Sequence, residues 1–262
     1  MEITGYSASI LIGISLGLIG GGGSILTVPV MVYLFTVDTV LATTYSLFVV
    51  GSTSLVGSFA YLKKGLINLK TTLFFGIPSI IAVFFTRHFI LPSIPEHITN
   101  IGSFDLSRSI LLMVFFAILM VFASYSMIKK GSVDELQHHD TSIFSVVWQG
   151  AAVGVVTGLI GAGGGFLIIP ALVNLLKLPV KTAIGTSLLI IAVNSLAGFG
   201  FSLGQSHIHW SFLLTVTAMA IVGIFIGSYL STKIDSKKLK PAFGWFVLVM
   251  GIYILIKETI LK

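Results

Sequence analysis

Two glycine clusters are the residues of this chain whose type and spacing point most clearly to chemistry. One is a run of four glycines at residues 20–23 followed by Ser24, and the other is Gly-Ala-Gly-Gly-Gly at residues 161–165. Glycine disfavours helix continuation by about 1 kcal/mol per residue relative to alanine, so each cluster predicts a helix break. The short apolar segment after each break carries Pro29 or Pro170 in its first turns, where a missing N–H is tolerated. The free N–H groups and the positive dipole end of such a segment form an anion site. The predicted anion-binding residues of the two breaks are Gly21, Gly22, Gly23, Ser24, Gly163, Gly164 and Gly165.

Small polar side chains follow on the next apolar segment of each half and could hold the same ligand. Ser46 and Thr53 are seven residues apart, as are Ser187 and Asn194, and this spacing places each pair on one helical face. Hydroxyls and an amide can bind a small anion without a buried charge. The alternative is ordinary hydrogen bonding between helices, which is the commoner role for any single Ser or Thr. The predicted ligand-binding residues of these segments are Ser46, Thr53, Thr186, Ser187 and Asn194.

The composition places these segments in a membrane. Of the 262 residues, 55% are hydrophobic and 9% are charged, whereas soluble domains carry about 25% charged residues. Residues 3–37, 39–62, 141–176 and 182–232 are free of charge, and a spanning helix needs roughly 20 apolar residues. We therefore expect an all-α polytopic protein of the cell membrane, surrounded by the lipid bilayer. The net charge of +6 then indicates membrane topology and not a nucleic-acid partner.

The residue types also argue against an enzyme. The chain has no cysteine, which excludes thiol catalysis and thiolate metal sites. No apolar segment carries an Asp or Glu that could relay protons. His138, His139 and Asp140 on a polar stretch are weak evidence for a metal site, and a solvated connector explains them better. We expect neither a cofactor nor an enzymatic step.

An internal duplication organises the chain. When Gly13 is aligned with Gly154, residues 13–29 match residues 154–170 without a gap, and nine of these 17 pairs are identical. The same alignment of the two halves places residues 42–57 on residues 183–198. Chance apolar similarity does not readily place Gly, Pro and Ser together over such a length. We therefore predict four hydrophobic segments in each half. The predicted units are a first repeat at residues 1–128, a polar linker at residues 129–143 and a second repeat at residues 144–262.

Lysine and arginine distinguish two topologies for these repeats. If all eight segments span the membrane, the basic residues divide 8 to 7 between its faces, whereas re-entrant first segments divide them 11 to 4. The positive-inside rule favours the second arrangement, in which each half crosses three times and the halves are inverted. The linker is then cytoplasmic and both termini lie outside. Eight plain spans from a parallel duplication are the alternative.

The basic residues also bear on how an anion could be bound. We expect every Lys and Arg, including Arg87 and Arg108, to lie at or near a segment end. No cation would then be buried in the bundle. The sequence therefore predicts an anion held by helix ends and hydroxyl groups alone.

The glycine motifs resemble those of the TauE/SafE family of sulfite-exporter-like membrane permeases. The matching elements are Gly-Leu-Ile-Gly-Gly-Gly-Gly-Ser before Pro29, Gly-Leu-Ile-Gly-Ala-Gly-Gly-Gly before Pro170, and Ala-Ile-Gly-Thr-Ser-Leu at residues 183–188. The first half departs from the Gly-Thr-Ser pattern, and the bulky Tyr45 that replaces its threonine is expected to reshape half of the site. The resemblance implies transport of a small anion, such as sulfite, another sulfur oxyanion or an organosulfonate, usually outward.

These observations together predict a secondary transporter that works by alternating access, with one helix bundle rocking against the other. The membrane potential favours anion exit by about 2.3 kcal/mol per charge per 100 mV, so export needs no proton relay. Two alternatives stay open: an anion channel with the same site, and a membrane scaffold that transports nothing. The identity of the anion, the coupling ion and the oligomeric state are not decided by the sequence.

The inverted arrangement predicts that residue 135 and the C-terminus lie on opposite faces of the membrane. A reporter that is active only in the cytoplasm should be active when fused at residue 135 and inactive when fused at the C-terminus, because three crossings separate the two positions. The amounts of the two fusion proteins, measured by immunoblot, serve as the control. Activity at both positions would contradict three crossings per half.

Overall fold

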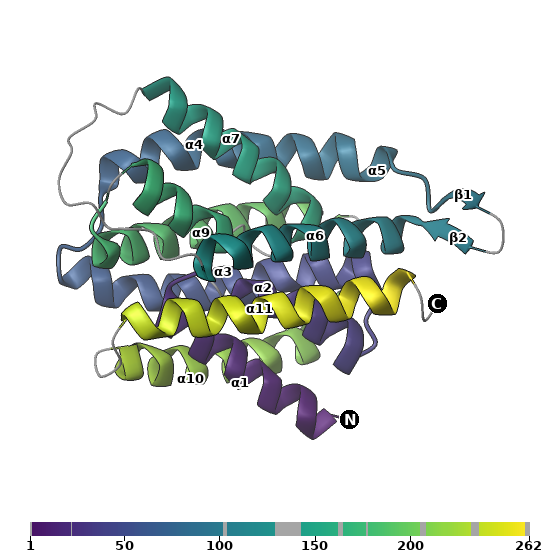
Figure 1. The fold of residues 1–262 in the computed structure, drawn as a ribbon, viewed down its shortest axis with the longest axis horizontal. Coiled ribbons are helices and arrows are strands. Elements are labelled where there is room, and N and C mark those ends of the chain that lie inside the picture. The colour runs from purple at the N-terminus through teal and green to yellow at the C-terminus, as the bar shows by residue number, and fades with distance from the viewer. Residues whose placement is uncertain are drawn as a thin grey trace.

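The apolar segments form helices, as their length and composition predict. A computed structural model describes residues 2–21, 23–101, 104–128, 143–161, 165–176, 178–204, 208–231 and 236–259. In it, helices run side by side along one long axis (Figure 1). The α-helices are α1 (Glu2–Ile19), α2 (Ser24–Pro29), α3 (Thr39–Lys63), α4 (Leu69–Phe85), α5 (Leu91–Ser93), α6 (Arg108–Ile128), α7 (Ile143–Ile160), α8 (Gly165–Pro170), α9 (Val180–Ser202), α10 (Trp210–Ser231) and α11 (Ser236–Thr259). Three short π-helices continue α2, α4 and α8, and these are η1 (Val30–Leu34), η2 (Thr86–Ile90) and η3 (Ala171–Leu175).

Five spans among the described residues are long and apolar enough to cross a membrane. They are Thr39–Lys63, Leu69–Ser93, Arg108–Tyr125, Val180–Ser202 and Trp210–Ser231. The glycine-broken first segments instead give shorter apolar helices, such as Gly5–Ile19 and Phe144–Ile160. The prediction of an all-α polytopic membrane protein is confirmed.

A small antiparallel sheet was not expected from the sequence. β1 (His97–Ile101) pairs with β2 (Phe104–Ser107), and the two strands follow directly on α5 and precede α6. They lie within residues 87–108, before the start of α6. This sheet stands at one end of the bundle, beyond the ends of the membrane helices (Figure 1).

The packing of the helices repeats between the two halves. In the alignment of the halves that matches Gly13 with Gly154, α1 corresponds to α7, α3 to α9 and α4 to α10. α1 packs most extensively on α10, and α7 packs on α4, so the same contact occurs twice with the halves exchanged. α3 packs on α9 across the centre, and α6 packs on α11. This pattern agrees with the duplication, while the repeat boundaries stay a prediction, with residues 129–142 of the proposed linker outside the described residues.

The course of the chain agrees with re-entrant first segments. In Figure 1 both termini lie at the end of the bundle that carries the β-sheet, and α7 begins at the opposite end. α1 starts at the sheet end, and the segment formed by α2 and η1 returns to the point where α3 begins. In the structure the chain thus runs along α1 and returns along α2 and η1, and a re-entrant first segment in the membrane stays a prediction. The orientation of the two halves in a membrane stays a prediction.

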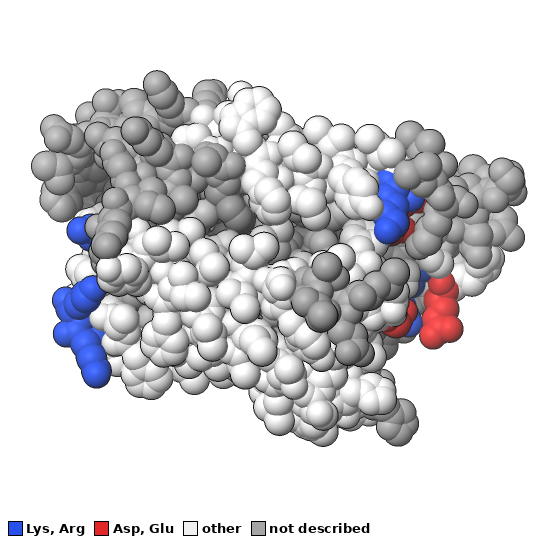
Figure 2. Space-filling view, turned by 90° about the horizontal axis from the view of Figure 1, so that it is seen from below, with Lys and Arg blue, Asp and Glu red and all other residues white. Residues whose placement is uncertain are grey.

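On the surface that Figure 2 shows, the charged side chains of the described residues lie at the two ends of the bundle. A broad uncharged band separates Lys and Arg at one end from both acidic and basic side chains at the other. Lys63, Lys64 and Lys70 are exposed around the turn between α3 and α4. An uncharged band of this kind is the surface that we expect the lipid bilayer to cover.

Glycines let the backbones of α1 and α10 touch. A methyl group added to Gly13 would collide with the Ala220 carbonyl oxygen, and one added to Gly17 would lie 2.6 Å from the Ile224 carbonyl oxygen. Close contact between backbones is the role that small residues play in membrane helix packing. The four-residue spacing of Gly13 and Gly17 predicts this packing role, and the structure confirms it.

Replacement of Gly13 by alanine should therefore destabilise the protein. The added methyl group has no room against α10, and such overpacking costs about 1–3 kcal/mol. A matched control is Gly200→Ala on α9, where the added methyl group would meet no atom within 4 Å. Thermal unfolding of the purified variants in detergent should give a lowered midpoint for Gly13→Ala and an unchanged or raised one for Gly200→Ala. Equal midpoints for the two variants would contradict the packing.

Candidate functional site

Both predicted helix breaks are present, at equivalent positions in the two halves. α1 ends at Ile19 and α7 ends at Ile160. The next residues, Gly20 and Gly161, have φ angles of 76° and 73°, in the left-handed region that favours glycine. Their N–H groups still close the last helical turn, with Gly20 N donating to the Leu16 carbonyl at 2.7 Å. Each helix is thus ended by a glycine cap before the chain changes direction.

The two breaks lie against each other. A methyl group added to Gly21 would lie 2.5 Å from the Gly165 carbonyl oxygen, and one added to Gly165 would lie 2.7 Å from the Gly21 carbonyl oxygen. Real Cβ atoms do not approach other atoms this closely, so only glycine permits the contact. The structure thus brings the two clusters together, while Gly22, Gly163 and Gly164 lie outside the described residues. Anion binding by these glycines stays a prediction.

Each break is packed against the corresponding helix of the other half. The backbone at Gly20 abuts Ile184 on α9, and the backbone at Gly161 abuts Thr43 on α3. Ile184 and Thr43 are equivalent in the alignment of the two halves. The hydroxyl of Ser187 lies 3.1 Å from the Gly20 carbonyl oxygen and 2.8 Å from that of Ile184. Ser187 therefore ties α9 to the first break.

The start of α2 is less open than the sequence suggested. Ser24 N donates to the Gly21 carbonyl at 3.4 Å, and Leu26 N donates to the Gly23 carbonyl at 3.2 Å. The Ser24 hydroxyl also donates to the Gly21 carbonyl, at 2.8 Å. A methyl group on Gly23 would lie 2.6 Å from the Ile12 carbonyl oxygen of α1, so Gly23 is needed for packing. Part of the predicted row of free N–H groups is occupied within the protein.

Thr186 and Tyr45 make the same link in the two halves. The Thr186 hydroxyl accepts a hydrogen bond from Asn68 N at 2.9 Å, and the Tyr45 hydroxyl accepts one from His209 N at 2.8 Å. Asn68 and His209 are themselves equivalent in the alignment of the two halves. Tyr45 therefore preserves a link between elements, and Thr186 has the helix-bonding role that the sequence left open.

Thr53 and Asn194 occupy equivalent positions but differ in their contacts. The Thr53 hydroxyl donates to the Val49 carbonyl of its own helix at 2.6 Å. The Asn194 side-chain amide donates to the Ser79 hydroxyl on α4 at 2.6 Å. The amide oxygen of Asn194 and the hydroxyl of Ser46 are buried and have no hydrogen-bond partner among the described residues. Because such atoms are costly to leave unpaired, these two are the side chains of the predicted set that can still take a ligand.

One arginine lies inside the bundle, where the sequence predicted none. Arg87 is 1% exposed and belongs to η2, which extends α4 so that one span runs from Leu69 to Ser93. Its Nη1 donates to the Thr44 hydroxyl at 3.2 Å, and its Nη2 donates to the Thr43 hydroxyl at 3.1 Å. Its Nε has no partner, and no carboxylate pairs with it, among the described residues. The prediction that no cation is buried is wrong for Arg87.

The sequence predicted a segment end at Arg87 because this residue follows an uncharged run. A charged residue after such a run usually marks the end of a membrane helix. The apolar residues Phe89, Ile90 and Leu91 that follow it were the signal that the span continues. The threonines that hold the guanidinium are on another helix, far away in the chain. Their contact with Arg87 could not be inferred from spacing.

Arg87 lies beside the second break and has no counterpart at the first. Thr43, which accepts from Arg87, is also the residue against which Gly161 packs. The position equivalent to Arg87 in the second half is Ser228. A buried charge without a partner is costly, and an anion would compensate it. The charge at the second break therefore favours an anion over a cation.

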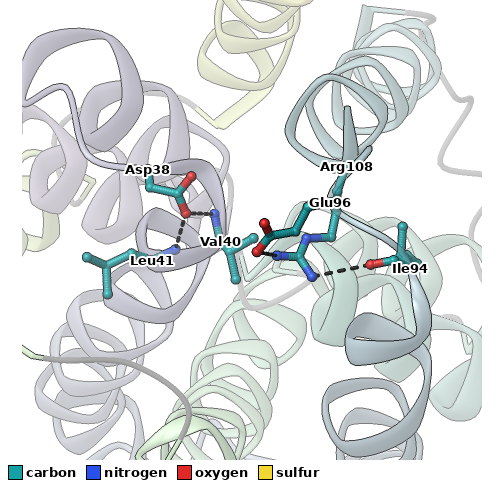
Figure 3. Close-up of polar contacts among 6 residues, drawn as sticks. All are labelled: Asp38, Val40, Leu41, Ile94, Glu96 and Arg108. Atoms are coloured by element: carbon teal, nitrogen blue, oxygen red, sulfur yellow. Dashed lines mark hydrogen bonds and ion pairs between the residues drawn. The ribbon is translucent and has the colours of Figure 1, made fainter. Parts of the chain in front are cut away.

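Arg108 shows how a paired arginine looks in the same protein (Figure 3). Its Nη2 donates to Glu96 Oε1 at 3.4 Å, and its Nη1 donates to the Ile94 carbonyl at 3.3 Å. It lines a cavity of about 270 Å³ together with Asp38, Val40, Glu96 and Ser109. The Val40 carbonyl accepts the Thr43 hydroxyl at 2.7 Å, so the cavity lies about one helical turn from the side chains that hold Arg87.

The described residues contain no group of three His, Cys, Asp or Glu side chains placed to hold a metal ion. His138, His139 and Asp140 lie outside the described residues.

The family model described as sulfite exporter TauE/SafE matches residues 6–254 of the chain. A probable membrane transporter protein of Xylella fastidiosa (strain Temecula1) is 27% identical over 253 residues, which cover 94% of this chain and 91% of the relative. Proteins of the same description from Bacillus subtilis and Methanocaldococcus jannaschii are 27% and 25% identical, over 89% and 94% of this chain and 90% and 92% of their own lengths. No solved structure gives a significant match.

The match extends over both halves and includes both glycine breaks. The family and the relatives are named as transporters and not as enzymes. The chain is thus a multi-pass membrane transporter of the cell membrane, and it belongs to the sulfite exporter TauE/SafE family.

Proposed function

We propose that this transporter moves a small anion outward across the cell membrane, and that the anion is sulfite, another sulfur oxyanion or an organosulfonate. The observation that carries the proposal is the contact of the two glycine breaks, Gly21 against Gly165, inside a bundle of membrane helices. Non-helical backbone at membrane depth occurs only where protein buries it or where it lines a cavity. In carriers built from inverted repeats, such broken segments form the substrate site.

The positive charge beside the second glycine break supports an anionic substrate. Arg87 contributes a positive charge next to the second break, and the described residues provide no carboxylate to neutralise it. The name of the family supports a sulfur oxyanion. Outward movement of an anion is also the direction that the membrane potential drives.

The predicted site residues contribute to this proposal in two ways. Gly21 and Gly165 form the contact between the breaks, and Ser46 and Asn194 carry buried polar atoms that are free to meet a ligand. The others shape the site through contacts within the protein or lie outside the described residues. These are Gly22, Gly23, Ser24, Thr53, Gly163, Gly164, Thr186 and Ser187.

Alternating access suits the way in which the two halves meet. α1 is held by α10 and α7 by α4, so each broken segment moves with a helix of the other half. The breaks themselves touch through the backbone atoms of Gly21 and Gly165. Such a contact can slide, which allows one bundle to rock against the other.

Transport assays in proteoliposomes test this proposal. Purified protein should give a saturable, counterflow-competent flux of radiolabelled sulfite. Gly21→Val should lower that flux by about tenfold or more, because the new side chain meets the Gly165 carbonyl and overpacking costs about 1–3 kcal/mol. Gly200→Ala, at an exposed and open position, is the matched control and should keep the flux of the unchanged protein.

Three results would contradict the proposal. Currents far above carrier turnover would indicate a channel with the same site. Equal flux in protein-containing and empty liposomes, for sulfite, sulfate, thiosulfate and sulfonates alike, would indicate a protein that transports none of these anions. Full flux in a folded Gly21→Val variant would show that the contact between the breaks is not part of the site.

A further inference from the structure

We infer that Arg87 binds the transported anion directly, through the edge of its guanidinium group that carries Nε. The inference rests on the proposed anion transport and names the residue that would supply the charge. It differs from the sequence prediction, which assigned binding to backbone N–H groups and hydroxyls without a cation.

The hydrogen bonds of Arg87 leave one edge of the guanidinium open. Nη1 and Nη2 donate to the neighbouring hydroxyls of Thr44 and Thr43, at 3.2 and 3.1 Å. Nε has no partner among the described residues, although the side chain is 1% exposed. A guanidinium group binds two oxygens of an oxyanion as a planar fork. The open edge therefore suits an oxyanion, such as a sulfite, sulfonate or carboxylate group, better than a halide.

The two threonines do not require Arg87 for their own stability. Thr43 donates to the Val40 carbonyl at 2.7 Å, and Thr44 donates to the same carbonyl at 3.3 Å. Both hydroxyl protons are thus used within α3, and only the oxygen lone pairs face the arginine. This arrangement positions the guanidinium without neutralising it, unlike the pairing of Arg108 with Glu96 in Figure 3.

Two more buried hydroxyl groups without a partner among the described residues come from η2 and α7, where these helices meet. The hydroxyls of Thr86 and Thr157 are buried and have no partner among the described residues. Thr86 precedes Arg87, and it packs against Gly158, the residue after Thr157: a methyl group on Gly158 would lie 2.6 Å from Thr86 Cβ. Hydroxyl groups can donate to an anion held by Arg87. A buried charge on η2 and two buried hydroxyls where η2 meets α7 thus have the chemistry of a polar ligand site.

The π-helix that carries Arg87 is found in the first half only, among the described residues. η1 and η3 follow the two breaks at equivalent positions, whereas η2, which carries Arg87, has no counterpart in α10. π-turns of this kind are frequent at functional sites. The asymmetry indicates one anion site, at the second break, instead of two equivalent sites.

Replacement of Arg87 tests this inference. Arg87→Gln should raise the KM for sulfite flux by about tenfold or more, because loss of a buried charge that meets an opposite charge is costly. Arg87→Lys keeps the charge but loses the planar fork, so its KM should lie between those of the unchanged protein and Arg87→Gln. Arg108→Gln is the matched control: Arg108 lines the nearby cavity but already pairs with Glu96, and its KM should change less than twofold or so.

Thermal unfolding separates binding from a purely structural role. Without ligand, Arg87→Gln should unfold at the same or a higher temperature, because a buried charge without a countercharge is removed. Sulfite should raise the unfolding midpoint of the unchanged protein and of Arg108→Gln, but not that of Arg87→Gln. A lowered midpoint together with a retained sulfite shift would assign Arg87 a structural role and overturn the inference.

The inference and the proposed function fail in different ways. If the unchanged protein transports sulfite and Arg87→Gln has the same KM and the same sulfite shift, the inference is wrong and the proposed function stands. If sulfite has no effect on the unchanged protein but a carboxylate or another oxyanion raises its midpoint, the proposed substrate is wrong. Loss of that shift in Arg87→Gln then still supports the role of Arg87, and its retention overturns it.

Discussion

The contact between the backbones of Gly21 and Gly165 is the constraint on which the rest of the structure depends. Two chain segments can reverse inside a membrane bundle only if their polar backbone groups are buried in protein. The structure meets this requirement by ending α1 and α7 with left-handed glycines and by placing the two reversals together. Side chains at either position would force the breaks apart, and the short segments after them would lose their contacts, α2 with α3 and α8 with α9.

The duplication explains why most contacts in the core occur twice, and the exceptions are informative. Thr186 and Tyr45 differ in size but reach equivalent backbone N–H groups, so this substitution leaves the architecture intact. Arg87 and Ser228 differ in charge, and nothing in the described part of the second half replaces the guanidinium. The two halves therefore share their helix packing. Arg87, the one buried arginine among the described residues, departs from this symmetry because it occurs in the first half only.

Local sequence signals predicted the parts of the structure that depend on local conformation. Runs of apolar residues gave the helices, and glycine clusters gave the breaks, because the absence of Cβ acts at the residue itself. The spacing of Gly13 and Gly17 likewise predicted close packing. What the sequence could not predict depends on partners from distant elements. The burial of Arg87 requires Thr43 and Thr44, and the hydroxyl of Thr186 accepts a hydrogen bond from Asn68 N. No periodicity within one helix reveals these contacts.

Thr43 links the buried charge to the second break, and this link bears on how binding could move the protein. Its hydroxyl accepts from Arg87, and its backbone and Cβ pack against Gly161. An anion that draws the open edge of the guanidinium toward itself pulls Nη2 away from Thr43 and so alters a contact that the break rests on. A ligand shifts a conformational equilibrium only by as much as it interacts differently with the two states. A substrate held by Arg87 would satisfy that condition through one side chain, because the same threonine contacts both the binding group and the element that has to move.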